Sequence, residues 1–252
     1  MISLKVYVIP GMANVSLSSR VNIVVQMDRI PGYDDRYGNW TDCKRFNVTK
    51  GMTPTPENAV QNLTEVNMGD PATLRDFVNW TISNYPANYY LLALWDHGIG
   101  CMGVCFDVTS SGDCLTLPEI SQALCGLPVI MDEVLIDACS MSMAEVAYQL
   151  KDCANILVCP EGLGYSPAPY DDYLLNLVSN SSKLPHELAT DVVTNYMDWC
   201  WSIPVNSIPN ATMSATDLTK IASLTASINS FATSLKEKED AYHKQIGLAR
   251  NL

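Results

Sequence analysis

The sequence predicts an α/β fold with a mostly parallel sheet flanked by helices and a helical C-terminal part. Two apolar runs, at 91–95 and 134–136, have the length of buried strands, and each stops at polar or reactive side chains. A helical pattern lies between them, and such a crossover places parallel strands side by side. We therefore expect one domain over 1–252, with the sheet in residues 1 to about 165 and the helical part from about 166.

The first half of the expected core follows from local signals. Residues 21–27 form an apolar run typical of a strand, and 41–48 indicates a further short, antiparallel strand. Asp70 and Pro71 have the residue types of an N-cap and a first helical position, and apolar residues follow at helical spacing as far as Pro86. A strand over 89–95 comes next.

The second half alternates in the same way. A Gly/Cys-rich stretch over 98–105 and a polar loop over 107–113 lead to Thr116 and Glu119, which have the spacing of a capping box at a helix start. The pattern then predicts a strand ending near Asp137, a helix over 141–150, a strand over 155–159 and a loop over 160–167. No strand is expected after 160. The predicted helices there cover 170–178, 186–201 and 217–236, with a Pro/Asn-rich break at 204–210.

Composition limits the possible partners and location. The net charge of −12 and the pI of about 4.5 disfavour nucleic acid and anionic membrane surfaces. No apolar run is long enough to span a bilayer, and the N-terminus lacks the pattern of a signal peptide. Nine cysteines and several glycosylation sequons favour an extracellular or cell-surface location. Cys139 apart, the other cysteines either pair as disulfides or are small buried hydrophobes.

The ends of the two key strands suggest chemistry. The carboxyl ends of parallel strands meet at one edge of the sheet, so His97 and Cys139 are expected side by side, a base beside a nucleophile. The predicted 141–150 helix would lower the pKa of the thiol through its dipole. Gly98 lets the backbone approach a substrate oxygen closely, so its N–H and that of Cys139 suit an oxyanion hole.

Other roles for these residues remain open at this stage. Taken alone, Cys139 is a buried thiol and His97 a hydrogen-bonded residue at a strand end. A third interpretation makes a zinc site from the imidazole and three thiols, although their spacing matches no recognisable zinc motif. The residues of that set are His97, Cys101, Cys105 and Cys114.

Two motifs resemble a known family. Trp-Asp-His-Gly at 95–98 and Asp-Ala-Cys-Ser-Met at 137–141 resemble the active-site motifs of the clostripain family of cysteine peptidases, which is similar in fold to caspases, gingipains and legumains. Further segments resemble the family at 21–34, 67–71, 115–119, 145–148, 169–171 and 214–218. Together they extend over about 21 to 220, which is most of the chain.

The resemblance implies an endopeptidase that cleaves after Arg, or Lys, through an acyl-enzyme. It implies that His97 is the general base and acid, Cys139 the nucleophile, and Gly98 and Cys139 the oxyanion donors. A basic P1 side chain needs a buried carboxylate partner. Asp137, on the same strand face as Cys139, is the first candidate, with hydrogen bonding to a nearby backbone amide as its alternative role. The other candidates are Glu161, Asp171 and Asp172.

The resemblance also bears on cofactors and partners. It implies no obligatory cofactor, although some relatives depend on calcium, for which the acidic residues offer oxygens without ordered spacing. These residues are Asp34, Asp35, Asp107 and Asp113. The expected partner is a peptide or protein with a basic P1 residue, with no nucleic acid, no membrane span and a monomeric chain.

Three departures from the family pattern affect these expectations. Relatives begin with a strand and helix ahead of the 21–27 strand, and only Leu4–Ile9 stands in for that strand here. The loop from Cys159 reads Cys-Pro-Glu-Gly, where the family tends to have Ser-Glu-Glu. The different N-terminus and the different loop favour the alternative of an inactive relative that acts as an extracellular binding module. Residues 98–138 contain no Lys or Arg, so we expect no self-cleavage there.

Overall fold

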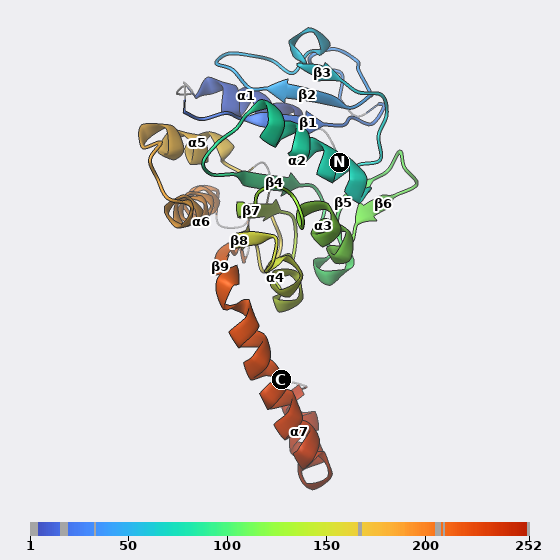
Figure 1. Ribbon diagram of the computed structural model, residues 1–252, viewed down its shortest axis with the longest axis vertical. Helices are drawn as coiled ribbons and strands as arrows, with labels where there is room; N and C mark the ends of the chain where they lie inside the picture. Colours follow the sequence, from blue (N-terminus) through green and yellow to red (C-terminus); the bar gives the residue numbers. More distant parts are fainter. Residues whose placement is uncertain are drawn as a thin grey trace.

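The predicted sheet has four strands in the computed structural model, in the order β4-β7-β8-β9 (Figure 1). The structure describes residues 5–15, 20–32, 34–165, 168–204, 208 and 210–250. Three neighbouring strands are parallel, namely β4 (Leu91–Trp95), β7 (Met131–Asp137) and β8 (Ala154–Cys159). The fourth, β9 (Ser214–Asp217), pairs antiparallel with β8. The mostly parallel α/β class is therefore confirmed.

Helices cover both faces of this sheet. One face packs against α2 (Pro71–Asn84), α3 (Leu117–Leu124) and α4 (Ala144–Leu150), and burial of apolar side chains there supplies one core. The other face packs against α1 (Lys5–Asn14), α5 (Tyr170–Ser179) and α6 (Pro185–Ser202). The side chains of β7 alternate between the two cores, with Val134 and Ile136 in the first and Leu135 in the second.

A second, antiparallel sheet precedes the main one in the chain. It contains β1 (Val24–Met27), β2 (Lys44–Asn47) and β3 (Gln61–Asn62), in that order, and a short 3-10 helix, η1 (Pro56–Asn58), comes before β3. The predicted antiparallel strand within 41–48 is thus confirmed. Its buried cation, Arg45, donates to Asp76 at 2.6 Å and lies 4.8 Å from the Trp80 ring.

The helix starts expected from capping residues are confirmed. The Asp70 side chain accepts a hydrogen bond from the backbone N–H of Ala72 at 2.8 Å, at the start of α2. At the start of α3, the Thr116 backbone N–H donates to the Glu119 carboxylate at 2.9 Å. Each bond satisfies a backbone N–H that has no partner within the helix.

Several elements differ from the sequence-based expectations. The prediction of no strand after 160 is wrong, because β9 pairs with β8 along its whole length. Residues 5–9, expected as a strand, belong to helix α1, while Leu4 lies outside the described residues. The 98–113 segment forms the 3-10 helix η2 (Gly100–Met102) and a hairpin of β5 (Val104–Asp107) and β6 (Asp113–Leu115). Residues 166–167 of the predicted loop, and 205–207 and 209 of the predicted break, are outside the described residues.

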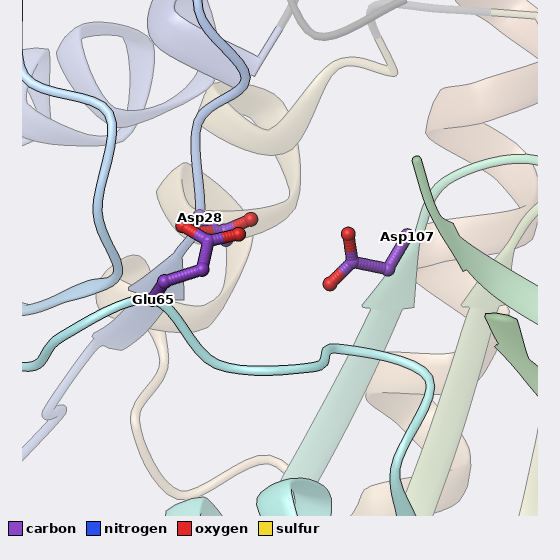
Figure 2. A group of neighbouring side chains, drawn as sticks. All are labelled: Asp28, Glu65 and Asp107. Atoms are coloured by element: carbon purple, nitrogen blue, oxygen red, sulfur yellow. The ribbon is translucent and has the colours of Figure 1, made fainter. Parts of the chain in front are cut away.

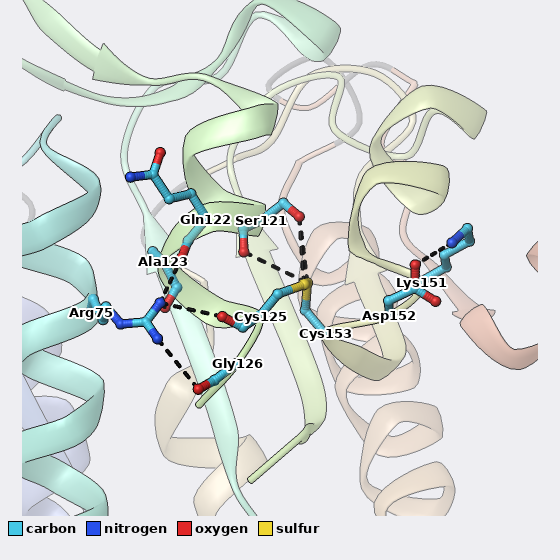
Figure 3. Close-up of a disulfide and its surroundings, with 9 residues drawn as sticks. All are labelled: Arg75, Ser121, Gln122, Ala123, Cys125, Gly126, Lys151, Asp152 and Cys153. Atoms are coloured by element: carbon cyan, nitrogen blue, oxygen red, sulfur yellow. Dashed lines mark hydrogen bonds and ion pairs between the residues drawn. A yellow bond between two sulfur atoms is a disulfide. The ribbon is translucent and has the colours of Figure 1, made fainter. Parts of the chain in front are cut away.

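One disulfide joins Cys125, after α3, to Cys153, the residue before β8 (Figure 3). Arg75 of α2 donates to the carbonyl oxygens of Gln122 at 2.7 Å and Gly126 at 3.3 Å, so the same loop is also tied to α2. Three further cysteines are buried thiols, namely Cys43, Cys159 and Cys200. Some cysteines are therefore paired in a disulfide and others are buried thiols, so each of the two interpretations of the cysteines holds in part.

The last element, α7 (Ile221–Arg250), follows the 3-10 helix η3 (Leu218–Lys220) and consists of two helical segments joined by a kink at Tyr242. The first segment projects away from the sheet (Figure 1). Its first residue is buried in the core, but most of its length is exposed, including the charged 236–240 segment. Among the described residues, no helix combines the length and apolar character that a membrane crossing requires.

Glu133, on the β7 face that contacts α5 and α6, is a buried carboxyl group without a hydrogen-bond partner among the described residues. Burial raises the pKa of Glu133 from 4.5 to about 8, because the ionised form is poorly solvated there. The unfolded chain loses this proton near pH 4.5, whereas the folded chain retains it. The contribution of Glu133 to the free energy of unfolding is therefore greatest below pH 4.5 and falls as the pH rises towards 8.

We predict that Glu133→Gln weakens this pH dependence. Linkage gives a loss in the wild-type chain of roughly 3 kcal/mol between pH 4.5 and pH 7, which a glutamine does not share. Urea unfolding at pH 5 and pH 8 measures the effect, with the exposed Glu239→Gln on α7 as the control. Parallel pH profiles for Glu133→Gln and the wild type would show that Glu133 is ionised in the folded chain.

Candidate active site

The parallel ladder between β4 and β7 brings the two predicted reactive residues to the same level. Trp95 lies opposite Asp137 in this ladder, so His97 and Cys139 both come two residues beyond paired positions. Each belongs to the loop that leaves the carboxyl end of its strand. The expectation that the backbones of these residues reach one edge of the sheet is therefore met.

Close backbone contact joins the two loops. A Cβ atom on Gly98 would lie 2.8 Å from the Cys139 carbonyl oxygen and 2.9 Å from the Cβ of Ala138. A Cβ on Gly100 would lie 3.3 Å from the Ser140 carbonyl oxygen, and Gly100 has a φ of 57°. The loop after β4 thus fits against the loop after β7 only because it carries glycine at both points.

The hairpin that the sequence did not predict holds the His97 loop. The Cys105 backbone N–H donates to the His97 carbonyl oxygen at 3.2 Å, and the Ile99 N–H donates to the Gly103 carbonyl oxygen at 3.0 Å. These bonds flank an antiparallel bridge between Gly98 and Val104. The His97 side chain is exposed, and it makes no hydrogen bond with another described residue, so its ring is accessible from solvent.

A third loop, at 160–164, flanks Cys139 on the β8 side. The Ser140 N–H donates to the Gly162 carbonyl oxygen at 2.6 Å, and the Ser142 N–H donates to that of Pro160 at 2.9 Å. The Gly164 N–H points at the Cys139 Sγ atom at 3.4 Å. The thiol is half-buried between the loops after β4 and β8.

The expectation that a helix dipole lowers the pKa of the Cys139 thiol is wrong. The predicted helix over 141–150 begins only at Ala144, with Met143 as its N-cap. Ser142 is instead held in the loop by its bond to Pro160, which prevents an earlier helix start. Because the dipole acts within about one turn of a helix terminus, α4 does not supply the dipole stabilisation expected for Cys139.

The carboxylates proposed for a basic side chain have different surroundings. Asp137 is buried, and the Tyr170 hydroxyl donates to its Oδ2 atom at 3.0 Å. Burial raises the pKa of Asp137 to about 7, and the Tyr170 hydrogen bond partly opposes that rise. This phenol on α5 had no sequence signal that linked it to Asp137. Its contact replaces the backbone amide considered as the alternative partner.

The other carboxylate candidates are exposed. Glu161 lies in the 160–164 loop, three residues before Gly164, whose N–H points at the Cys139 Sγ atom. Asp171 and Asp172 lie in the first turn of α5, and burial raises the pKa of Asp172. Both line a hollow between α1, α5 and α6 in which neither His97 nor Cys139 takes part. Asp171 and Asp172 thus line a hollow that is separate from the loops of His97 and Cys139.

Of the four acidic residues considered for calcium, only Asp107 belongs to a group of potential metal ligands among the described residues. Among the described residues, one group of potential metal ligands has its ligand atoms within 4.8 Å of one another, and it consists of Asp28, Glu65 and Asp107 (Figure 2). Asp107 accepts hydrogen bonds from the Met68, Thr109 and Ser110 backbones. Carboxylate oxygens are ligands of the type that calcium prefers. The zinc set of His97 and three cysteines does not form such a group within the described part of the chain.

Comparisons with known proteins identify a family that this sequence matches. The profile of the clostripain family matches residues 7–249. Clostripain of Hathewaya histolytica is 30% identical over 159 residues, which make up 53% of this chain and 30% of the relative. The chain thus spans less than a third of that protein.

Solved structures show the same fold. A secreted cysteine protease of Bacteroides thetaiotaomicron in complex with an irreversible peptide inhibitor has a TM-score of 0.64 at 22% identity, over 81% of this chain and 58% of that one. An inactive zymogen from Parabacteroides distasonis has a TM-score of 0.65 at 19% identity, over 88% and 58%. The α/β sheet with helices on both faces is the fold of these proteases. By its sequence, the chain belongs to the clostripain family.

We predict that Gly98→Ala destabilises the chain because its new methyl group would meet the backbone of Cys139. Overpacking of this kind costs typically 1–3 kcal/mol in the free energy of unfolding. Gly247→Ala on α7 is the matched control, because a Cβ there meets nothing within 4 Å. Urea unfolding of both variants measures the difference. Equal stability of Gly98→Ala and the wild type would show that the two loops are not in the contact described.

Proposed function

We propose that this chain is the peptidase part of a cysteine endopeptidase that cleaves peptide bonds after Arg or Lys, with His97 and Cys139 as its dyad. The observation that carries the proposal is the close fit of the Gly98 loop against the Cys139 backbone at the ends of two paired parallel strands. Family membership supports the same activity.

Each proposed role follows from the chemistry of the side chain. The His97 imidazole takes the proton of the Cys139 thiol, and the thiolate attacks the scissile carbonyl carbon. The N–H groups of Gly98 and Cys139 donate to the oxyanion of the tetrahedral intermediate. The imidazolium then returns the proton to the leaving amine, and water hydrolyses the acyl-enzyme with His97 as the base. No step requires a cofactor.

Asp137 is our candidate for the group that binds the basic P1 side chain. It is the buried member of the carboxylate candidates, and it precedes Cys139 by two residues. A guanidinium or ammonium group gains most from a carboxylate that water does not screen. The exposed Glu161 and Asp171 are weaker candidates for that reason.

We further propose an extracellular location and a monomeric chain that takes peptide or protein substrates. The disulfide supports the location, since such bonds persist in oxidising compartments. Two solved relatives are described as secreted. The acidic charge of the chain supports attraction of basic substrates over nucleic acid.

A second candidate is a catalytically inactive binding module. The observation that favours it is that the Cys139 Sγ atom contacts the backbone of Gly164, whereas His97 makes no side-chain hydrogen bond with a described residue. The hydrogen bond between a catalytic base and its nucleophile is often long in a free enzyme and shortens when substrate binds. The geometry of the free chain therefore does not decide between the two candidates, and a measurement of turnover does.

We predict that Cys139→Ala and His97→Ala each lower hydrolysis of Arg- and Lys-containing fluorogenic peptides by roughly 10³-fold or more, because nucleophile and base act as one unit. Cys101→Ala removes an exposed thiol and serves as the matched control, which should keep full activity. An Arg-directed acyloxymethyl ketone should label the wild type and the control, but not Cys139→Ala. Unchanged turnover in either dyad variant would refute the assignment.

We predict that the preference for arginine over the uncharged citrulline at P1 increases as the pH rises through about 7. The Asp137 carboxyl has a pKa of about 7, so its charge appears over this range. The ratio of the two kcat/KM values is the measurement, because titration of the dyad affects both substrates and cancels.

Asp137→Asn should lower that ratio on the order of 10²-fold and remove its pH dependence, as expected when one partner of a buried charge pair is lost. Glu161→Gln and Asp171→Asn are the controls, and neither should change the ratio. A ratio that follows Glu161 or Asp171 would reassign the basic-residue pocket.

A further inference from the structure

Large apolar side chains stand exposed on both sides of Cys139. Ile99 is 53% exposed in the loop after β4, and Leu163 is 58% exposed in the loop after β8. Single exposed apolar residues are common on protein surfaces. These two differ from such residues because each follows or precedes a glycine whose backbone contacts Cys139.

Backbone contacts hold Leu163 at a defined position. The residue before it, Gly162, accepts a hydrogen bond from the Ser140 N–H at 2.6 Å. The residue after it, Gly164, has its N–H 3.4 Å from the Cys139 Sγ atom. Thr212 Oγ1 accepts further bonds from the loop, from the Glu161 and Gly162 N–H groups. The Leu163 side chain is therefore presented to solvent by a loop with little freedom.

Ile99 is held in a corresponding way on the β4 side. Its own N–H donates to the Gly103 carbonyl oxygen at 3.0 Å, and its carbonyl oxygen accepts from the Met102 N–H at 3.1 Å. The residue before it, Gly98, fits against the Cys139 carbonyl oxygen. Met102 in the same loop is also exposed, at 67%.

The order of the strands fixes on which side of Cys139 each of these two loops lies. In the sheet, β7 lies between β4 and β8, so Ile99 and Leu163 come from the loops on opposite sides of Cys139 (Figure 1). Neighbouring strands are about 4.8 Å apart and an extended peptide rises about 3.3 Å per residue, so a substrate crossing the strand ends passes one neighbouring loop within roughly one to two residues.

The geometry points to Ile99 and Leu163 as specificity-determining residues that favour apolar substrate side chains on the two sides of the cleaved bond. This inference rests on the proposed peptidase function and deepens it. The substrate class becomes a peptide with a basic P1 residue flanked by apolar residues on both its N-terminal and C-terminal sides. One of the two residues contacts the P2 or P3 side chain, and the other contacts P1′ or P2′.

Internally quenched peptides with Arg at P1 test the inference. Four peptides place Leu or Ser at the flanking positions on the N-terminal side, and Leu or Ser at those on the C-terminal side. The wild type should prefer Leu on both sides. Leu163→Ser should reduce that preference about fivefold on one side only, and Ile99→Ser on the other side only, because each removes one apolar contact.

Leu224→Ser on α7 is the matched control, because it removes an equally accessible apolar side chain far along the chain from the site. Leu163→Met keeps the apolar surface and should keep the preference. Turnover with preferences that Leu163→Ser and Ile99→Ser leave intact would overturn this inference and leave the peptidase function standing. Loss of both preferences in a single variant would also overturn the two-sided arrangement. A wild-type chain without turnover on any of the four peptides would overturn both proposals.

Discussion

The contact on which the site depends is between two loops at the carboxyl ends of β4 and β7. Parallel pairing brings the loops level, and the absence of a side chain at Gly98 lets them touch. Without that contact, the backbones of Gly98 and Cys139 would lie farther apart. The β5–β6 hairpin and the 160–164 loop then brace the pair from either side. Tight backbone packing thus positions these two loops at one edge of the sheet.

The strand that carries Cys139 also carries two buried carboxyl groups, and their surroundings distinguish them. Glu133 and Asp137 lie on the same face of β7, since side chains alternate along a strand. Tyr170 donates a hydrogen bond to Asp137, whereas Glu133 has no partner among the described residues. Burial raises both pKa values, but only Asp137 lies at the end of the strand beside the reactive residues. The position of Asp137 at the strand end, more than its pKa, therefore makes it a functional candidate, whereas Glu133 only destabilises the fold when it ionises.

Apolar periodicity and capping residues predicted most of the core. The features that were not predicted depend on contacts between residues far apart in the sequence. The caps at Asp70 and Thr116 are set by neighbours in sequence, so α2 and α3 could be predicted. The pairing of β9 with β8 depends on segments more than fifty residues apart, and Ser214–Asp217 has no apolar run to announce it. Similarly, Tyr170 reaches Asp137 only through the packing of α5 on the sheet. The pairing of Cys125 with Cys153 could not be derived from spacing, because several pairings were compatible with the same sequence.

The late start of α4 changes how the thiol of Cys139 would be activated. With no helix terminus at the thiol, an anion on Sγ would be stabilised by the His97 cation and by the nearby Gly164 N–H. A negative charge on Asp137 would oppose that anion, but with a pKa of about 7 this carboxyl group is only partly ionised at neutral pH. A basic P1 side chain would bring the matching positive charge when it binds, since its presence favours the ionised carboxylate. In the proposed function, binding of a cationic residue therefore both selects the substrate and balances the charge beside the nucleophile.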